Sequence, residues 1–147
     1  MRQDIGENVR TGELKKELGQ AIKDIRSANS AGGISQRKLA EAVDIPPSNM
    51  KYIEDGVNAP SPRVYSAIVR YLKPEPSQRK KLDRLYSAIR ETPPPDVCKI
   101  ICANEGLNDV LRTVKELRLS QDQLTMMHSL LASFNADAEN AVHEQRT

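Results

Sequence analysis

The chain has 147 residues, of which 38% are hydrophobic and 3% aromatic, so it can fold as one domain or two small ones around an aliphatic core. No apolar run approaches the roughly 20 residues of a membrane span, and the N-terminus lacks the apolar segment of a signal peptide. We therefore expect a soluble, cytoplasmic protein with no membrane partner. The net charge is +2, but residues 1–95 carry 17 basic and 12 acidic side chains and residues 96–147 carry 5 and 8, an asymmetry that suits a first half facing a polyanion.

The N-terminal segment combines an irregular lead-in with one amphipathic helix. Residues 1–12 have little hydrophobic periodicity, and we expect an N-terminal arm there. Residues 13–28 are predicted to be helical, because Leu14, Leu18 and Ile22 recur at intervals of four. The small residues that follow end this helix.

The next segment predicts two short helices. Ser35 is placed to cap the first, whose apolar face contains Leu39 and Val43. Pro46 stops that helix, because the residue before a proline is driven out of the α region. The second helix opens at the following proline and ends at Gly56. Two short helices joined by a tight turn constitute a helix-turn-helix.

The second of these helices carries a polar outer face. Its outward side chains are Ser48, Asn49, Lys51 and Tyr52, which can hydrogen-bond base edges or phosphates in a major groove. Asn49 suits adenine, and Lys51 suits guanine or a phosphate.

Several linked positions in residues 18–72 share one pattern. They are Leu18-Gly19 with Ile22 and Arg26, Ser35-Gln36 with Leu39-Ala40, Ile53-Glu54-Asp55-Gly56, and Pro60-Ser61. On these residues, about a third of the chain resembles the DNA-binding domain of Cro and lambda-repressor-type regulators, the xenobiotic-response-element family. The turn departs from the family pattern, because Asp44 stands at the usual glycine and Pro46 at the usual polar cap.

The resemblance implies an all-α chain in which residues 13–92 form a five-helix DNA-binding domain. It implies a recognition helix at about 47–55, braced by Gln36, which would also reach a base or a phosphate. The loop before residue 61 and the start of the next helix would then lie against the DNA backbone. The candidate DNA-binding residues are Gln36, Arg37, Lys38, Pro47, Ser48, Asn49, Lys51, Tyr52, Asn58, Ser61 and Arg63.

Two more helices are predicted to complete this domain, at 61–72 and 77–91, capped by Ser61 and Ser77. The basic run 79–81 is interpreted as a solvated face.

Pro93-Pro94-Pro95 predicts a stiff linker. Residues 96–135 then show three amphipathic helical patterns, and 136–147 are expected to be a flexible tail. The first pattern is expected to bury Val97, Ile100 and Ile101. Because about forty residues cannot close a core alone, the region is predicted to pair with a second copy or a partner protein. The predicted dimer-interface residues are Val110, Leu111, Val114, Leu124, Met127, Leu131 and Phe134.

The sequence favours a sequence-specific, dimeric DNA-binding regulator, a repressor, acting on double-stranded DNA at a palindromic operator. The alternative is an antitoxin-like module whose C-terminal helices bind another protein while the helix-turn-helix autoregulates. No phosphate loop or nucleophile elbow is found, so we expect neither an enzyme nor a cofactor. Cys98 and Cys102 are interpreted as core residues, and no metal site is expected, because His128 and His143 match no zinc pattern.

Overall fold

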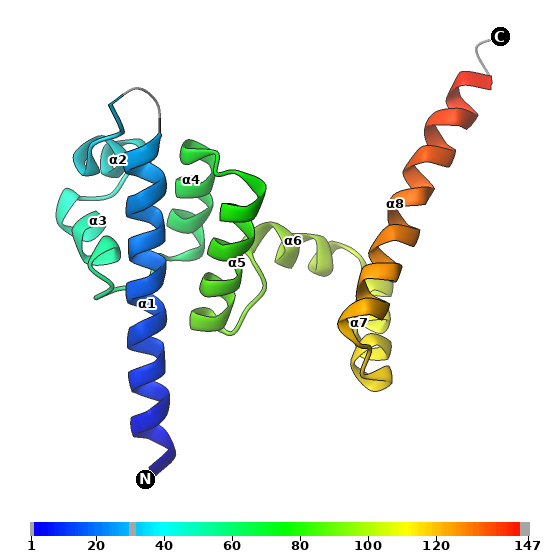
Figure 1. Ribbon diagram of the computed structural model, residues 1–147, viewed down its shortest axis with the longest axis horizontal. Helices are drawn as coiled ribbons and strands as arrows, with labels where there is room; N and C mark the ends of the chain where they lie inside the picture. Colours follow the sequence, from blue (N-terminus) through cyan, green and yellow to red (C-terminus); the bar gives the residue numbers. More distant parts are fainter. Residues whose placement is uncertain (1, 30–31, 145–147) are drawn as a thin grey trace. The chain divides into compact units, whose positions relative to one another are not determined.

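The computed structural model describes residues 2–29 and 32–144, and this part of the chain is helical with no strand (Figure 1). By its internal contacts the chain divides into two compact units, Met1–Cys102 and Ala103–Thr147. The prediction of an all-α chain is confirmed. The described helices are α1 (Arg2–Ala28), α2 (Gln36–Ala42), α3 (Pro47–Glu54), α4 (Pro62–Leu72), α5 (Pro76–Arg90), α6 (Pro95–Ala103), α7 (Glu105–Leu117) and α8 (Gln121–Glu144).

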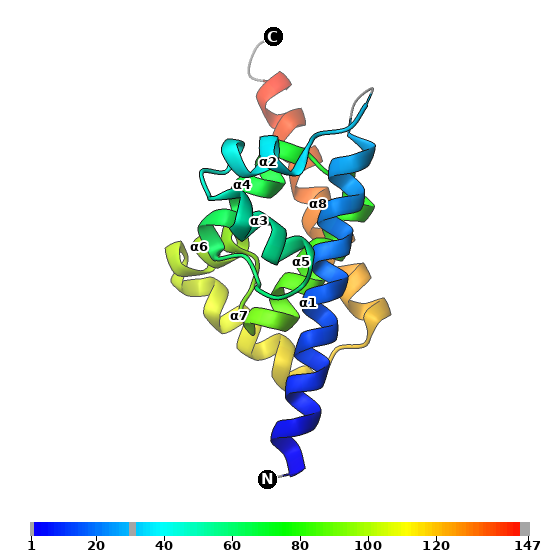
Figure 2. The same cartoon turned by 90° about the vertical axis from the view of Figure 1, so that its left-hand side faces the viewer.

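The first unit has one aliphatic core. Helix α1 packs against α3 and α5, and α2 packs against α3 and α4 (Figures 1 and 2). Tyr65 and Tyr86 are fully buried and stack with ring centroids 4.1 Å apart and planes 21° apart. The largest aliphatic side chains of the core are Leu18, Ile22, Leu39, Met50, Ile68, Leu82 and Leu85.

Helix α1 begins at Arg2, so the arm expected over residues 1–12 is instead the first part of a helix, apart from Met1, which lies outside the described residues. A helix that is already nucleated extends at little cost per residue and needs no apolar stripe to do so. Weak periodicity was therefore a poor guide to its start.

The turn between α2 and α3 is built from backbone geometry and one side-chain contact. Ser35 caps α2 as predicted, because its Oγ accepts a hydrogen bond from the backbone N–H of Lys38 at 3.1 Å. Asp44 has φ 58°, in the left-handed region that glycine adopts most easily. The guanidinium of Arg63 donates to the backbone carbonyl of Asp44 at 3.2 Å. Pro46 precedes α3 without a side-chain cap.

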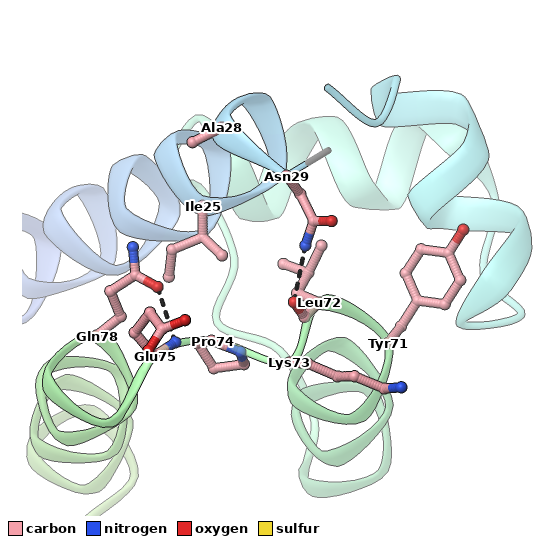
Figure 3. Close-up of a pocket in the computed structure, with 9 residues that line it drawn as sticks. All are labelled: Ile25, Ala28, Asn29, Tyr71, Leu72, Lys73, Pro74, Glu75 and Gln78. Carbon is pink, nitrogen blue, oxygen red and sulfur yellow. Dashed lines mark hydrogen bonds between the residues drawn. The ribbon is translucent and has the colours of Figure 1, made fainter. Parts of the chain in front are cut away.

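Helices α4 and α5 start at different kinds of cap. Ser61 caps α4, as predicted, by accepting a hydrogen bond from the N–H of Val64 at 3.3 Å. The prediction that Ser77 caps α5 was wrong, since Glu75 is the N-cap and its N–H donates to Gln78 Oε1 at 3.0 Å. Asn29, at the end of α1, donates to the carbonyl of Leu72 at 2.8 Å across the recess shown in Figure 3.

Arg79 fastens α6 to the rest of the first unit. Its Nε lies 2.9 Å from Asp83 Oδ1, and its Nη2 lies 3.1 Å from Asp96 Oδ2 at the start of α6. Arg79 is thus paired and only partly exposed, so the interpretation of the run 79–81 as a solvated face was wrong at this residue. Pro95 is the first residue of α6 and not the last residue of a linker. The boundary between the two compact units follows Cys102 and therefore lies beyond the three prolines.

The surface of α6 differs from the expected one. None of its residues is buried, so the prediction that Val97, Ile100 and Ile101 form a buried face was wrong. Cys98 is half-buried and Cys102 exposed, which also contradicts their interpretation as core residues. A stripe of apolar residues shows that a helix is amphipathic. The stripe alone does not show whether another element covers that face.

The second unit contains α7 and α8. A capping box starts α8 as predicted: Ser120 Oγ accepts from the N–H of Gln123 at 3.3 Å, and Ser120 N–H donates to Gln123 Oε1 at 2.9 Å. Helix α8 continues to Glu144, so the tail expected over 136–147 is helical up to that residue, and 145–147 lie outside the described residues.

The predicted dimer-interface residues fall into two groups by exposure. Val114, Leu124 and Met127 are half-buried. The four others remain largely exposed: Val110, Leu111, Leu131 and Phe134, at 51%, 47%, 57% and 58%.

Candidate nucleic-acid interface

Helix α3 turns an apolar side inward and a polar side outward. Met50 and Ile53 are buried in the core of the first unit. The side facing away from that core exposes Ser48, Asn49 and Lys51, together with Pro47 and Tyr52. In Figure 2, α3 faces the viewer with α2 beside it. The side chains predicted to contact bases are therefore accessible.

A buried ionic cluster holds α3 in place. Glu54, the last residue of α3, accepts from Arg26 Nε at 2.6 Å and Nη2 at 3.0 Å, and from Gln36 Nε2 at 2.8 Å. The cluster joins the ends of α1, α2 and α3. Gln36 is half-buried. Its amide donates to Glu54, so Gln36 contacts α3, as predicted.

The pairing of Arg26 with Glu54 was not predicted from the sequence. Glu54 follows Met50 and Ile53 at helical spacing, which places an acid on the buried face of α3. A buried carboxylate requires a partner. The position of Glu54 on the buried face of α3 therefore indicated that a basic side chain lies next to it. The identity of that side chain was hidden, because Arg26 lies 28 residues away.

Gly19 brings α1 and α3 into close approach. A Cβ on Gly19 would lie 2.3 Å from the carbonyl oxygen of Ile53 and 2.5 Å from that of Glu54. Only a residue without a side chain can occupy this point, since both obstructing atoms belong to the backbone. The position of the outward face of α3 therefore depends on Gly19 as well as on the ionic cluster.

Three of the basic candidates are paired with acids at the surface. Arg37 Nε lies 3.0 Å from Glu41, Lys51 Nζ lies 2.6 Å from Asp55, and Arg63 lies 3.9 Å from the carboxylate of Asp44.

The hydrogen bond and the charge of Asp55 raise the pKa of Lys51, so this amine stays protonated. Exposed pairs of this kind contribute little to stability, because water and salt screen their charges. A phosphate can therefore replace the carboxylate partner of each of these cations at little cost in free energy. Lys38 is exposed on α2 beside them.

The loop between α3 and α4 is held by contacts that the sequence did not reveal. The N–H of Asn58 donates to the carbonyl of Tyr52 at 3.1 Å. Arg90 of α5 donates through Nη2 to the carbonyls of Ala59 at 3.1 Å and Pro60 at 2.8 Å. The loop is thereby tied to both α3 and α5, which positions Asn58 at the surface.

The start of α4 offers backbone donors beside this loop. Ser61 and Arg63 are exposed, and the oxygen of Ser61 is used as the N-cap. The first N–H groups of a helix attract anions. The eleven predicted DNA-binding residues thus lie on α2, α3 and the segment 58–63, all exposed except the half-buried Gln36.

Two further observations concern the described part of the chain. Within it, no group of three or more His, Cys, Asp or Glu side chains is placed to hold a metal ion. Among the described helices none combines the length and the apolarity that crossing a membrane requires. Comparison with protein-family models, curated proteins and solved structures finds no match to this chain.

Proposed function

We propose that the protein is a sequence-specific, dimeric DNA-binding regulator, acting as a repressor, which reads the major groove with α3. The observation that carries this proposal is the fixed orientation of α3. Its inner side is held by apolar packing and by the Arg26–Glu54–Gln36 cluster, and its outer side is polar and accessible. A rigid helix with an exposed polar face is what direct readout of base edges requires.

In this proposal the surface residues divide between bases and phosphates. Asn49 and Lys51 contact base edges, because they lie on the outward face of α3. Arg37, Lys38 and Arg63 contact phosphates on either side, and the N-terminus of α4 adds backbone donors. Affinity should consequently fall steeply with rising salt, because each neutralised phosphate releases counterions.

Dimerisation is assigned to the second unit. Large apolar side chains such as Leu111, Leu131 and Phe134 are about half exposed there, and burying them stabilises an association by roughly 25 cal/mol per Å². A two-fold pair would place two α3 helices about 34 Å apart, one turn of DNA, on a palindromic operator.

The test starts with selection of binding sites for the full chain from a random duplex library. The recovered site is then titrated with the wild type, Asn49→Ala and Lys51→Ala. Each variant should bind the site about 5- to 150-fold more weakly, as expected for loss of one base contact worth about 1–3 kcal/mol. Binding to random DNA should change much less for Asn49→Ala.

Lys23→Ala is the matched control, because it removes an exposed lysine from α1 outside the proposed interface. It should bind like the wild type. Recovery of no common site, or equal discrimination between the site and random DNA in all four proteins, would refute the proposal.

A further inference from the structure

Helix α6 carries two cysteines that the proposed function does not use. Cys98 and Cys102 lie one helical turn apart, both in the first unit, with Cys98 half-buried and Cys102 exposed. The two side chains lie on one face of α6, and the charge of Cys102 raises the pKa of Cys98. They therefore form a pair of thiols on one face of a helix, one of them exposed.

The helical spacing decides what such a pair can do. Residues four apart on a helix have Cβ atoms about 5–6 Å apart, whereas a disulfide requires about 3.5–4.5 Å. Direct oxidation would therefore distort α6. Two sulfur atoms on those Cβ positions can instead converge on one atom lying between them without any change in the helix.

The donor set limits which atom that can be. Structural zinc takes four ligands, and the described residues offer no third His, Cys, Asp or Glu grouped with these two thiols. Thiolates select soft centres. A soft centre that is satisfied by two thiolates fits this site, and a hard or four-coordinate ion does not.

We propose that Cys98 and Cys102 form a two-thiolate binding site for a soft, thiophilic centre, either Cu(I) or the trivalent arsenic of an organoarsenical. With phenylarsine oxide, two S–H bonds break, two As–S bonds form, and the oxygen leaves with both protons as water. With Cu(I), two Cu–S bonds form and two protons are released. Neither reaction changes an oxidation state.

The first test uses the full chain, reduced and then mixed with one equivalent of phenylarsine oxide in the presence of millimolar glutathione. Intact-mass measurement should show one added C6H5As group and the loss of two hydrogens. The variants Cys98→Ser and Cys102→Ser each keep one thiol, so glutathione should strip the arsenical from both. Far-UV circular dichroism checks that all three proteins have the same helix content.

A second test titrates Cu(I) held by bicinchoninate into the same three proteins, with Zn(II) as the comparison ion. The wild type should remove one Cu(I) per chain, whereas the single-cysteine variants and Zn(II) should show no such transfer. Binding of both probes supports the shared site, and binding of one identifies that centre as the occupant. Equal behaviour of the wild type and the single-cysteine variants toward both probes would overturn the proposal.

Discussion

Arg26 of α1 and Glu54 of α3 form a two-contact ion pair, with Nε and Oε1 2.6 Å apart and Nη2 and Oε2 3.0 Å apart. The side chain of Glu54 is 1% exposed and that of Arg26 is 11% exposed. Taking two such charges out of water costs several kcal/mol for each ion. The pair therefore contributes mainly to orientation, because only one placement of α3 against α1 satisfies both groups.

Removal of one partner should be much more harmful than removal of both. Glu54→Leu leaves the guanidinium of Arg26 without its carboxylate and should lower the free energy of unfolding by about 3–5 kcal/mol. The double variant Arg26→Met with Glu54→Leu should recover most of that loss, because no buried charge remains. Urea unfolding of the wild type, both single variants and the double variant measures the coupling. A double variant as unstable as the sum of its single variants would contradict this account.

Gly19 and Gly12 provide a matched pair on α1. Gly19→Ala places a methyl group against the carbonyls of Ile53 and Glu54, and should destabilise the protein by about 2–3 kcal/mol, since two helix backbones must move apart. Gly12→Ala meets nothing within 4 Å and should stabilise the protein by about 0.5–1 kcal/mol, through helix propensity alone. Urea midpoints measure both effects. Effects of the same sign at the two positions would show that close approach does not govern Gly19.

The hydroxyl of Tyr65 should make stability decline at alkaline pH. This hydroxyl donates to Asp83 Oδ1 at 2.6 Å, and burial, followed by that hydrogen bond and the charge of Asp83, raises the pKa of Tyr65 above its ordinary value of 10.0. Below this value the group is protonated in both the folded and unfolded states. Above it the unfolded state loses the proton first, so the free energy of unfolding falls by about 1.4 kcal/mol per pH unit from this group.

Tyr65→Phe removes that titration. The variant should be less stable than the wild type near pH 8, because Asp83 loses a hydrogen-bond donor. The difference in the free energy of unfolding between the two proteins should shrink between about pH 10 and pH 11. In this range only the wild type is destabilised by ionisation of Tyr65 in its unfolded state. Urea unfolding at both ends of this range measures the difference. Stability curves that stay parallel would show that Tyr65 ionises equally readily in both states.

The features predicted from the sequence were those with local causes. The caps at Ser35 and Ser61 and the capping box at Ser120 each involve atoms three residues apart, so the spacing of residue types was sufficient. The outward positions of α3 followed from the same kind of reasoning, because Met50 and Ile53 identify the inner face.

The features that the sequence did not reveal depend on contacts between distant residues. Arg26 and Glu54 are 28 residues apart, and Arg90 reaches a loop 30 residues before it. Neither contact leaves a periodic signal. The exposure of α6 was missed for a related reason, since the apolar stripe of Val97 and Ile100 indicates a face that can be covered and does not identify a partner.

The second unit provides the last prediction, which concerns assembly. All fully buried apolar residues of the described chain precede residue 87, so a chain ending at Asn104 retains the entire core of the first unit and should stay folded. The apolar side chains removed with α7 and α8 include Leu111, Leu131 and Phe134, which are 47–58% exposed. The proposed dimer would bury them.

The shortened chain should sediment as a monomer and bind the selected DNA site far more weakly, because one α3 reaches one half-site and the effective concentration supplied by pairing is lost. Leu111→Glu with Leu131→Glu in the full chain should have the same effect, since charges at the interface core oppose association. Thr113→Glu is the control, because it adds a charge at an exposed polar position of α7. If the shortened and full chains dimerise and bind DNA equally, the exposed face of α7 and α8 serves a different protein, and the antitoxin-like alternative becomes the better account.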